Sequence, residues 1–131
     1  MRASQHVKTS GPLFDGRAQR ALNDFIREFA ENYADDVNDE LQSRFDRVFK
    51  NPTGRYAAHV RAGRIGKGRS AVTGGDLPYG PWLEGGSRRN RKSSFKGYHS
   101  FRLVARKMRR RAKIVANAEF RRRYLRRMNG V

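Results

Sequence analysis

The sequence contains no cysteine, which excludes disulfide bridges and thiolate metal sites. It also contains no run of about 18 consecutive apolar residues, the length that a membrane-spanning helix requires. Residues 1–14 lack the apolar stretch of a secretory signal, so we expect a soluble protein without a signal peptide. At 131 residues, the chain is long enough for one ordinary domain with a single modest core.

Acidic residues are scarce in the second part of the chain. Lys and Arg outnumber Asp and Glu by 30 to 12, which gives a formal net charge of +18. Residues 15–50 carry nine acids and six bases, whereas residues 51–131 carry twenty-two bases and three acids. This asymmetry indicates an acidic or nucleic-acid partner, or self-association in which the acidic part of one copy faces the basic part of another. A solvated basic surface without a dedicated partner is the remaining alternative.

Residues that carry catalysis or bind metals are few and scattered. His6, His59 and His99 lie far apart and have no carboxylate three or four residues away. Residues 63–68 are rich in glycine, but their lysine is followed by Gly, so they do not match a phosphate-binding loop. Glu84 has no second acid nearby, and we expect it to cap a turn or to pair with an arginine. The sequence therefore predicts a protein that is not an enzyme and uses no cofactor or metal ion.

Apolar residues recur every three or four positions in two long segments, which predicts two helices. The first helix covers residues 15–48, with Asp15 as its N-cap. At roughly 50 Å it should either break near residues 34–38 or project beyond its own domain. The second, basic helix covers about residues 100–128, with Ser100 as its cap and Asn129-Gly130 as its stop. Acids lie opposite the apolar stripe of the first helix: Glu31, Asp35, Asp36, Asp39 and Glu40.

Between the helices, alternating apolar and polar residues predict short strands. We expect strands at residues 55–62 and 69–74, joined by a glycine-containing hairpin, and a third strand near residues 79–84. The predicted fold class is α+β, with a long N-terminal helix, a small antiparallel sheet with a hairpin, and a basic C-terminal helix. Residues 1–14 are expected to form a flexible N-terminal arm, and residues 15–131 a single domain.

The most unusual segment is residues 77–87, which read Leu-Pro-Tyr-Gly-Pro-Trp-Leu-Glu-Gly-Gly-Ser. It holds the only tryptophan and two of the four prolines, and it predicts a rigid aromatic docking turn. Trp82 should anchor this turn against the core or against a neighbouring subunit. Residues 85–97 are nearly devoid of apolar side chains, so we expect a mobile basic loop. Its cations could bind phosphate or insert into an acidic groove of a neighbour, and both alternatives stay open.

The order of three sequence boxes resembles a known family. The boxes are Pro52-Thr53-Gly54-Arg55, Val72-Thr73-Gly74 and Tyr79-Gly80-Pro81-Trp82-Leu83-Glu84-Gly85. They are similar to the gp-ten-like family of small neck and tail-completion proteins of long-tailed bacteriophages, in the version found in phages of actinobacteria. The resemblance covers about residues 15–125. The chain departs from the family at Tyr98-His99-Ser100-Phe101, where the family has an Arg-Pro-Phe-aliphatic-Pro entry to its last helix.

The resemblance implies a virion subunit, made in the host cytoplasm, that forms a ring at the head–tail junction. Such rings commonly hold six copies and adjoin neck, stopper or tail-tube proteins, in a connector, tail-completion or tail-terminator role. A basic nucleic-acid-binding protein is the alternative function, and contact with packaged DNA stays open. No membrane partner is expected. We expect a subunit interface built from the docking turn, the basic loop and the acidic helix face: Tyr79, Trp82, Glu84, Arg88, Arg89, Arg91, Lys92, Asp35, Asp36 and Asp39.

Overall fold

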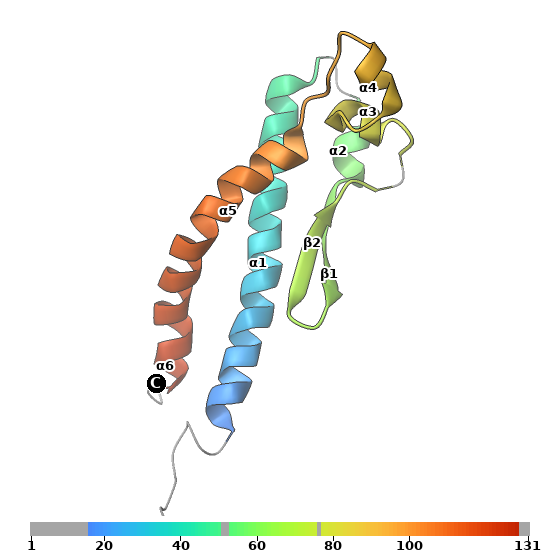
Figure 1. The fold of residues 1–131 in the computed structure, drawn as a ribbon. Helices are drawn as coiled ribbons and strands as arrows, with labels where there is room; N and C mark the ends of the chain where they lie inside the picture. Colours follow the sequence, from blue (N-terminus) through green and yellow to red (C-terminus); the bar gives the residue numbers. More distant parts are fainter. Residues whose placement is uncertain (1–15, 51–52, 76, 129–131) are drawn as a thin grey trace, which may run out of the picture.

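A computed structural model of the chain describes residues 16–50, 53–75 and 77–128. A long N-terminal helix, α1, lies between the C-terminal helix α5 on one side and a two-stranded antiparallel sheet on the other (Figure 1). The two long helices run antiparallel, and a segment with the two short helices α3 and α4 lies near the end where α5 begins (Figure 1). The predicted α+β class, with its long N-terminal helix, small sheet and C-terminal helix, is confirmed.

Helix α1 (Arg17–Val48) is unbroken over 32 residues, so the break expected near residues 34–38 is wrong. It begins after Gly16, whose φ of 80° lies in the left-handed region, and the predicted N-cap Asp15 falls outside the described residues. The C-terminal helices and the sheet pack along α1 and cover its apolar stripe within the same chain. That coverage explains why so long a helix is compatible with a domain of this size.

The first predicted strand, residues 55–62, is wrong except at its last two residues. Residues 55–59 form the short helix α2 (Arg55–His59), and strand β1 covers Arg61–Gly66. Helix α2 follows Gly54, which has a φ of 79°, and it directs Tyr56 into the core against the rings of Phe45 and Phe49. Strand β2 (Arg69–Thr73) lies where the sequence predicts it and pairs antiparallel with β1, Arg61 opposite Thr73.

The third predicted strand is also wrong, because Gly80–Glu84 form helix α3. Pro81 lies in its first turn, where the fixed φ of proline suits a helix and the missing N–H is not needed. Gly85, with a φ of 106°, ends it in the left-handed conformation typical of a helix C-terminus. Helix α4 (Arg88–Lys92) follows inside the segment expected to be a mobile basic loop. The mobility of that segment stays a prediction.

The C-terminal helix is interrupted once. Helix α5 (Ser100–Glu119) passes into a π-helical turn, η1 (Phe120–Tyr124), and then into α6 (Leu125–Met128). The predicted cap is wrong by one residue, since His99 precedes α5 as its N-cap while Ser100 is buried in the first turn. The predicted stop, Asn129-Gly130, lies outside the described residues. In the π turn, Phe120 meets the ring of Phe25 on α1 edge to face, 5.6 Å between centroids.

The core lies between α1, α5 and the start of the hairpin. Leu41 and Phe45 of α1 are its most deeply buried side chains, at 1% and 2% exposure. Val104 and Met108 of α5 pack against them, and the Tyr33 hydroxyl donates a hydrogen bond to the Met108 carbonyl. Among the residues that the structure describes, no helix is long and apolar enough to cross a membrane.

Candidate assembly surface

Helix α3 presents Trp82 to the segment that follows it. The Trp82 ring is half-buried and lies 5.0 Å, centroid to centroid, from the Phe95 ring. The guanidinium of Arg89 lies over the Trp82 ring, 5.1 Å from its centroid, in a cation–π arrangement. Trp82 therefore packs on residues 89–95 of its own chain and lies outside the main core cluster, so the predicted contact with the core is wrong, and a contact with a neighbouring subunit stays a prediction.

Asn90 holds the turn and α4 together from the inside. Its side chain is 3% exposed, and its amide nitrogen donates to the carbonyls of Trp82 and Phe95, at 3.0 and 3.2 Å. Its amide oxygen accepts from the backbone N–H of Ser87, at 2.9 Å, while the Ser87 hydroxyl accepts from the Arg89 N–H. This reciprocal capping box gives a five-residue basic helix a defined start. A buried, fully used amide explains why this cationic segment folds back on α3.

Two glycines close the segment at its base. Gly85 and Gly97 both have positive φ, 106° and 94°, and their backbones touch. A Cβ built on Gly97 would lie 2.3 Å from the Cα of Gly85, a distance that real side chains do not reach. Next to this contact, the N–H of Tyr98 donates to the Leu83 carbonyl at 2.7 Å, and that of His99 to the Glu84 carbonyl at 3.2 Å. Residues 85–97 thus leave the fold and rejoin it at one point, and we call residues 77–99 as a whole the α3–α4 segment.

Glu84 caps helix α5 from a distance of seventeen residues in sequence. Its two carboxylate oxygens accept hydrogen bonds from the backbone N–H groups of Phe101 and Arg102, at 3.1 and 3.2 Å. His99, the formal N-cap residue, has no capping side-chain bond. A carboxylate at this place satisfies two first-turn donors and lies at the positive end of the helix dipole. The expectation that Glu84 acts as a cap is therefore confirmed, and what it caps is the first turn of helix α5.

A hollow of about 780 Å³ opens between the end of α1, α2 and the base of the α3–α4 segment. Tyr98 joins its two sides, since the Tyr98 ring lies 5.2 Å from Phe49 and 5.0 Å from Phe95. Burial raises the pKa of the Tyr56 hydroxyl in this hollow, and the nearby Glu84 carboxylate and Tyr79 add to the effect. Tyr79 therefore lies in the wall of an aromatic hollow and contributes to the packing of its own chain.

No protein-family model matches the chain. No curated protein sequence and no solved structure is significantly similar to it. The role of this surface must therefore be inferred from its own contacts and charges.

Three of the four cations predicted for the interface are directed to solvent. Arg88, Arg91 and Lys92 of α4 are exposed, and within the described part of the chain none of them makes an ion pair. Arg89 is exposed too, but its guanidinium is engaged by the Trp82 ring. Because the capping box fixes α4, these three side chains form a cationic patch with a defined position on the α3–α4 segment.

The acids predicted for the interface lie near the middle of α1, whereas α4 lies near the C-terminal end of that helix (Figure 1). Asp35, Asp36 and Asp39 of α1 are exposed and make no ion pair with any residue that the structure describes. Asp36 and Asp39 line a hollow of about 320 Å³ together with Arg111 of α5. The structure therefore does not bring these acids together with the α4 cations within one chain.

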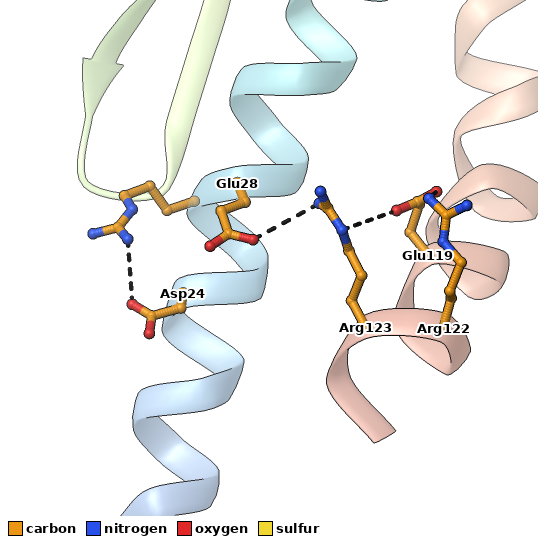
Figure 2. Close-up of polar contacts among 6 residues, drawn as sticks. Asp24, Glu28, Glu119, Arg122 and Arg123 are labelled. Atoms are coloured by element: carbon orange, nitrogen blue, oxygen red, sulfur yellow. Dashed lines mark hydrogen bonds and ion pairs between the residues drawn. The ribbon is translucent and has the colours of Figure 1, made fainter. Parts of the chain in front are cut away.

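Other acids of α1 meet the basic C-terminal helices within the same chain, so this part of the acidic face is not left for a second copy. Glu40 pairs with Lys107 at 2.9 Å and with Arg111 at 3.6 Å. Near the other end, Arg123 of the π turn lies between Glu28 of α1 and Glu119, at 3.7 and 3.4 Å (Figure 2). Complementary charges on α1 and α5 thus help to fix the antiparallel helix pair.

Glu40 gives a test of this pairing. Its hydrogen bond from Lys107 lowers the pKa of the Glu40 carboxyl, and the charges of Lys107 and Arg111 lower it further. A lowered folded-state pKa stabilises the fold above the ordinary glutamate pKa of about 4.3, and this stabilisation is lost as the pH falls through the folded-state pKa. Because the pair is partly exposed, we expect Glu40→Gln to cost at most about 1 kcal/mol near pH 7 and less than that near pH 3.

Urea unfolding of both proteins at the two pH values measures this difference. Asp35→Asn is the matched control, since it removes an exposed acid without an ion pair and should have little effect at either pH. The same loss for Glu40→Gln at both pH values would contradict the ion pair and indicate a packing effect.

Proposed function

We propose that this chain is a structural subunit of the neck of a long-tailed bacteriophage, and that copies of it assemble as a ring in a connector, tail-completion or tail-terminator position. The sequence boxes that resemble the gp-ten-like family support this proposal. The order of elements agrees with it as well: a long N-terminal helix, a hairpin, the aromatic box and a C-terminal helix. Neighbouring partners would be stopper, neck or tail-tube proteins.

The observation that carries the proposal is the closed α3–α4 segment. Residues of the family-like box have structural roles here: Trp82 anchors α4, Glu84 caps α5, and Gly85 packs directly on Gly97. The result is a small protrusion with a cationic patch on its outside and exposed acids elsewhere on the same chain, and neither set makes an ion pair with a described residue. Unlike patches on one subunit favour a head-to-tail contact, which closes into a ring when the rotation permits.

The hairpin offers a second element for such contacts. Its strands pair only with each other among the described residues, so both outer edges keep backbone groups that a neighbouring chain can bind. Ile65, on β1, is 62% exposed, which places an apolar side chain at the end of the hairpin. A ring contact that covers these groups would bury polar and apolar surface at the same time.

The proposal is tested by the mass and symmetry of the purified full-length protein. We expect native mass spectrometry and negative-stain microscopy to detect closed rings that form as the concentration rises through the micromolar range. Raising the salt concentration should weaken the rings, because the proposed contact pairs exposed charges. A protein that stays monomeric up to millimolar concentration, or that forms only open filaments, would contradict the proposal.

A further inference from the structure

The cations of α5 fall on two different faces of the helix. Helix α5 carries seven Lys and Arg residues and one acid, Glu119, at its end. Lys107 and Arg111 face α1 and pair there with Glu40. Four further cations lie on the side away from the buried residues Val104 and Met108, and we call them the outer row: Arg102, Arg106, Arg109 and Lys113.

The outer row is a straight, rigid and unneutralised line of charge. Its members are spaced four, three and four residues apart, which places them on one face over about 16 Å at 1.5 Å per residue. All four side chains are exposed, and none makes an ion pair within the ranges 16–50, 53–75 and 77–128. The opposite face of the helix is packed on α1, so the row cannot rotate away from solvent.

We propose that the outer row binds the phosphate backbone of double-stranded DNA without sequence preference. A duplex carries about one negative charge per 1.7 Å of its axis, and a row of cations gains affinity by releasing its condensed counterions. No acid of α5 interrupts the row. This inference does not rest on ring formation, since one copy presents the whole row.

The geometry disfavours other anionic partners. A protein interface has a core depleted of charge, whereas the exposed apolar residues nearest the row, Leu103 and Ile114, are eleven positions apart and form no patch. Single strands need aromatic stacking platforms, but Phe120 of the C-terminal helix is directed toward Phe25 of α1. A membrane-binding amphipathic helix inserts its apolar face, and here α1 covers that face.

Double-stranded RNA is recognised largely through its 2′-hydroxyl groups and the shape of its minor groove. The outer row has only Arg and Lys side chains, which suit phosphate oxygens equally along any duplex surface they can reach. Double-stranded DNA is therefore the partner to which we commit, and RNA, single strands and anionic vesicles become arms of the test.

The test uses the full-length protein and a fluorescein-labelled duplex of random sequence, with anisotropy as the readout. The row variant changes all four members of the outer row to Gln. The matched control changes four exposed hairpin cations to Gln and lowers the net charge by the same amount: Arg61, Arg64, Lys67 and Arg69. Circular dichroism checks that both variants keep their helices, which glutamine tolerates well.

For four phosphate contacts, the affinity of the unmodified protein should fall roughly 150-fold between about 50 and 200 mM salt. The row variant should bind roughly 100-fold or more weakly at about 100 mM salt and lose most of this salt dependence. The hairpin control should lose much less. Equal losses in the two variants, no DNA binding even at low salt, or a row effect on vesicles, single strands or RNA larger than that on duplex DNA would each overturn the proposal.

Discussion

Replacing Gly97 by alanine is expected to destabilise the protein by about 3 kcal/mol or more. Gly97 has a φ of 94°, and a Cβ there would lie 2.3 Å from the Cα and 2.4 Å from the nitrogen of Gly85. Backbone atoms cannot move aside as the tip of a flexible side chain can. The chain must therefore open between Gly85 and Gly97, which breaks the hydrogen bonds of Tyr98 and His99 to α3. The Glu84 cap on α5 is lost with them.

Gly86→Ala is the matched control. Gly86 is adjacent to Gly85, yet it does not have a positive φ and no atom lies within 4 Å of a Cβ built on it. Trp82 is the only tryptophan in the chain, so its fluorescence reports directly on the α3–α4 segment during a urea titration. We expect a large shift of the Trp82 transition for Gly97→Ala and almost none for Gly86→Ala. Equal stability of the two variants would contradict the closed segment and favour the mobile loop that the sequence predicts.

The second large effect is expected on assembly. Changing Arg88, Arg91 and Lys92 to Glu should abolish ring formation while leaving the monomer folded. These three side chains contact solvent and have no ion pair in the described structure, so the monomer loses little. At a contact with the acids of the next copy, each reversal replaces an attraction of about 0.2–1 kcal/mol by a repulsion. Three reversals should weaken each contact by roughly 3 kcal/mol, more than a hundredfold.

Sedimentation at several concentrations measures this effect. The matched control reverses three exposed cations of α5, Arg106, Arg109 and Lys113, which the proposed ring contact does not use, and keeps the α4 patch. Adding Asp35→Lys to the α4 triple variant should restore part of the assembly if α4 meets the acidic face of α1. Asp36 and Asp39 are left unchanged, because they share a hollow with Arg111 and their reversal would disturb the monomer itself. Normal rings from the α4 triple variant would rule out the charge contact.

The long helices could be predicted from the sequence because periodicity accumulates over many turns. Thirty-two residues of α1 and twenty of α5 repeat an apolar position every three or four residues, and no strand has that period. Over five residues, the helical period of three to four residues cannot be distinguished from the strand period of two. Tyr56, Ala58 and Val60 occupy every second position, as the apolar residues of a strand do, yet a helix begins after Gly54. At α3, proline near the start and glycine after the end were the better signal, and the alternation of apolar residues was misleading.

The sequence predicted some of the residues that form the candidate surface, but it did not predict which residues contact one another. The sequence singles out Trp82 and the lone acid Glu84, and the structure gives both a defined role. The sequence does not single out Phe95, which packs on the Trp82 ring, or Asn90, which joins α4 to the Trp82 carbonyl. Ser87 followed three residues later by Asn90 differs from the usual capping box, in which the second residue is Glu or Gln. The hydrogen bond between the Glu84 carboxylate and the Phe101 N–H joins residues seventeen positions apart, and no short sequence pattern predicts a contact at that separation.

The pairing of α1 with α5 has a consequence for the time at which the protein can fold. The Tyr33 hydroxyl and the Met108 carbonyl, which join the two helices, are 75 residues apart in sequence. A ribosome adding about 5–20 residues per second completes α1 several seconds before it makes the partner that covers Phe25 and Leu41. During that interval the apolar stripe of α1 stays uncovered by its native partner. The native pairing of α1 with α5 can therefore form only after α5 has been synthesised.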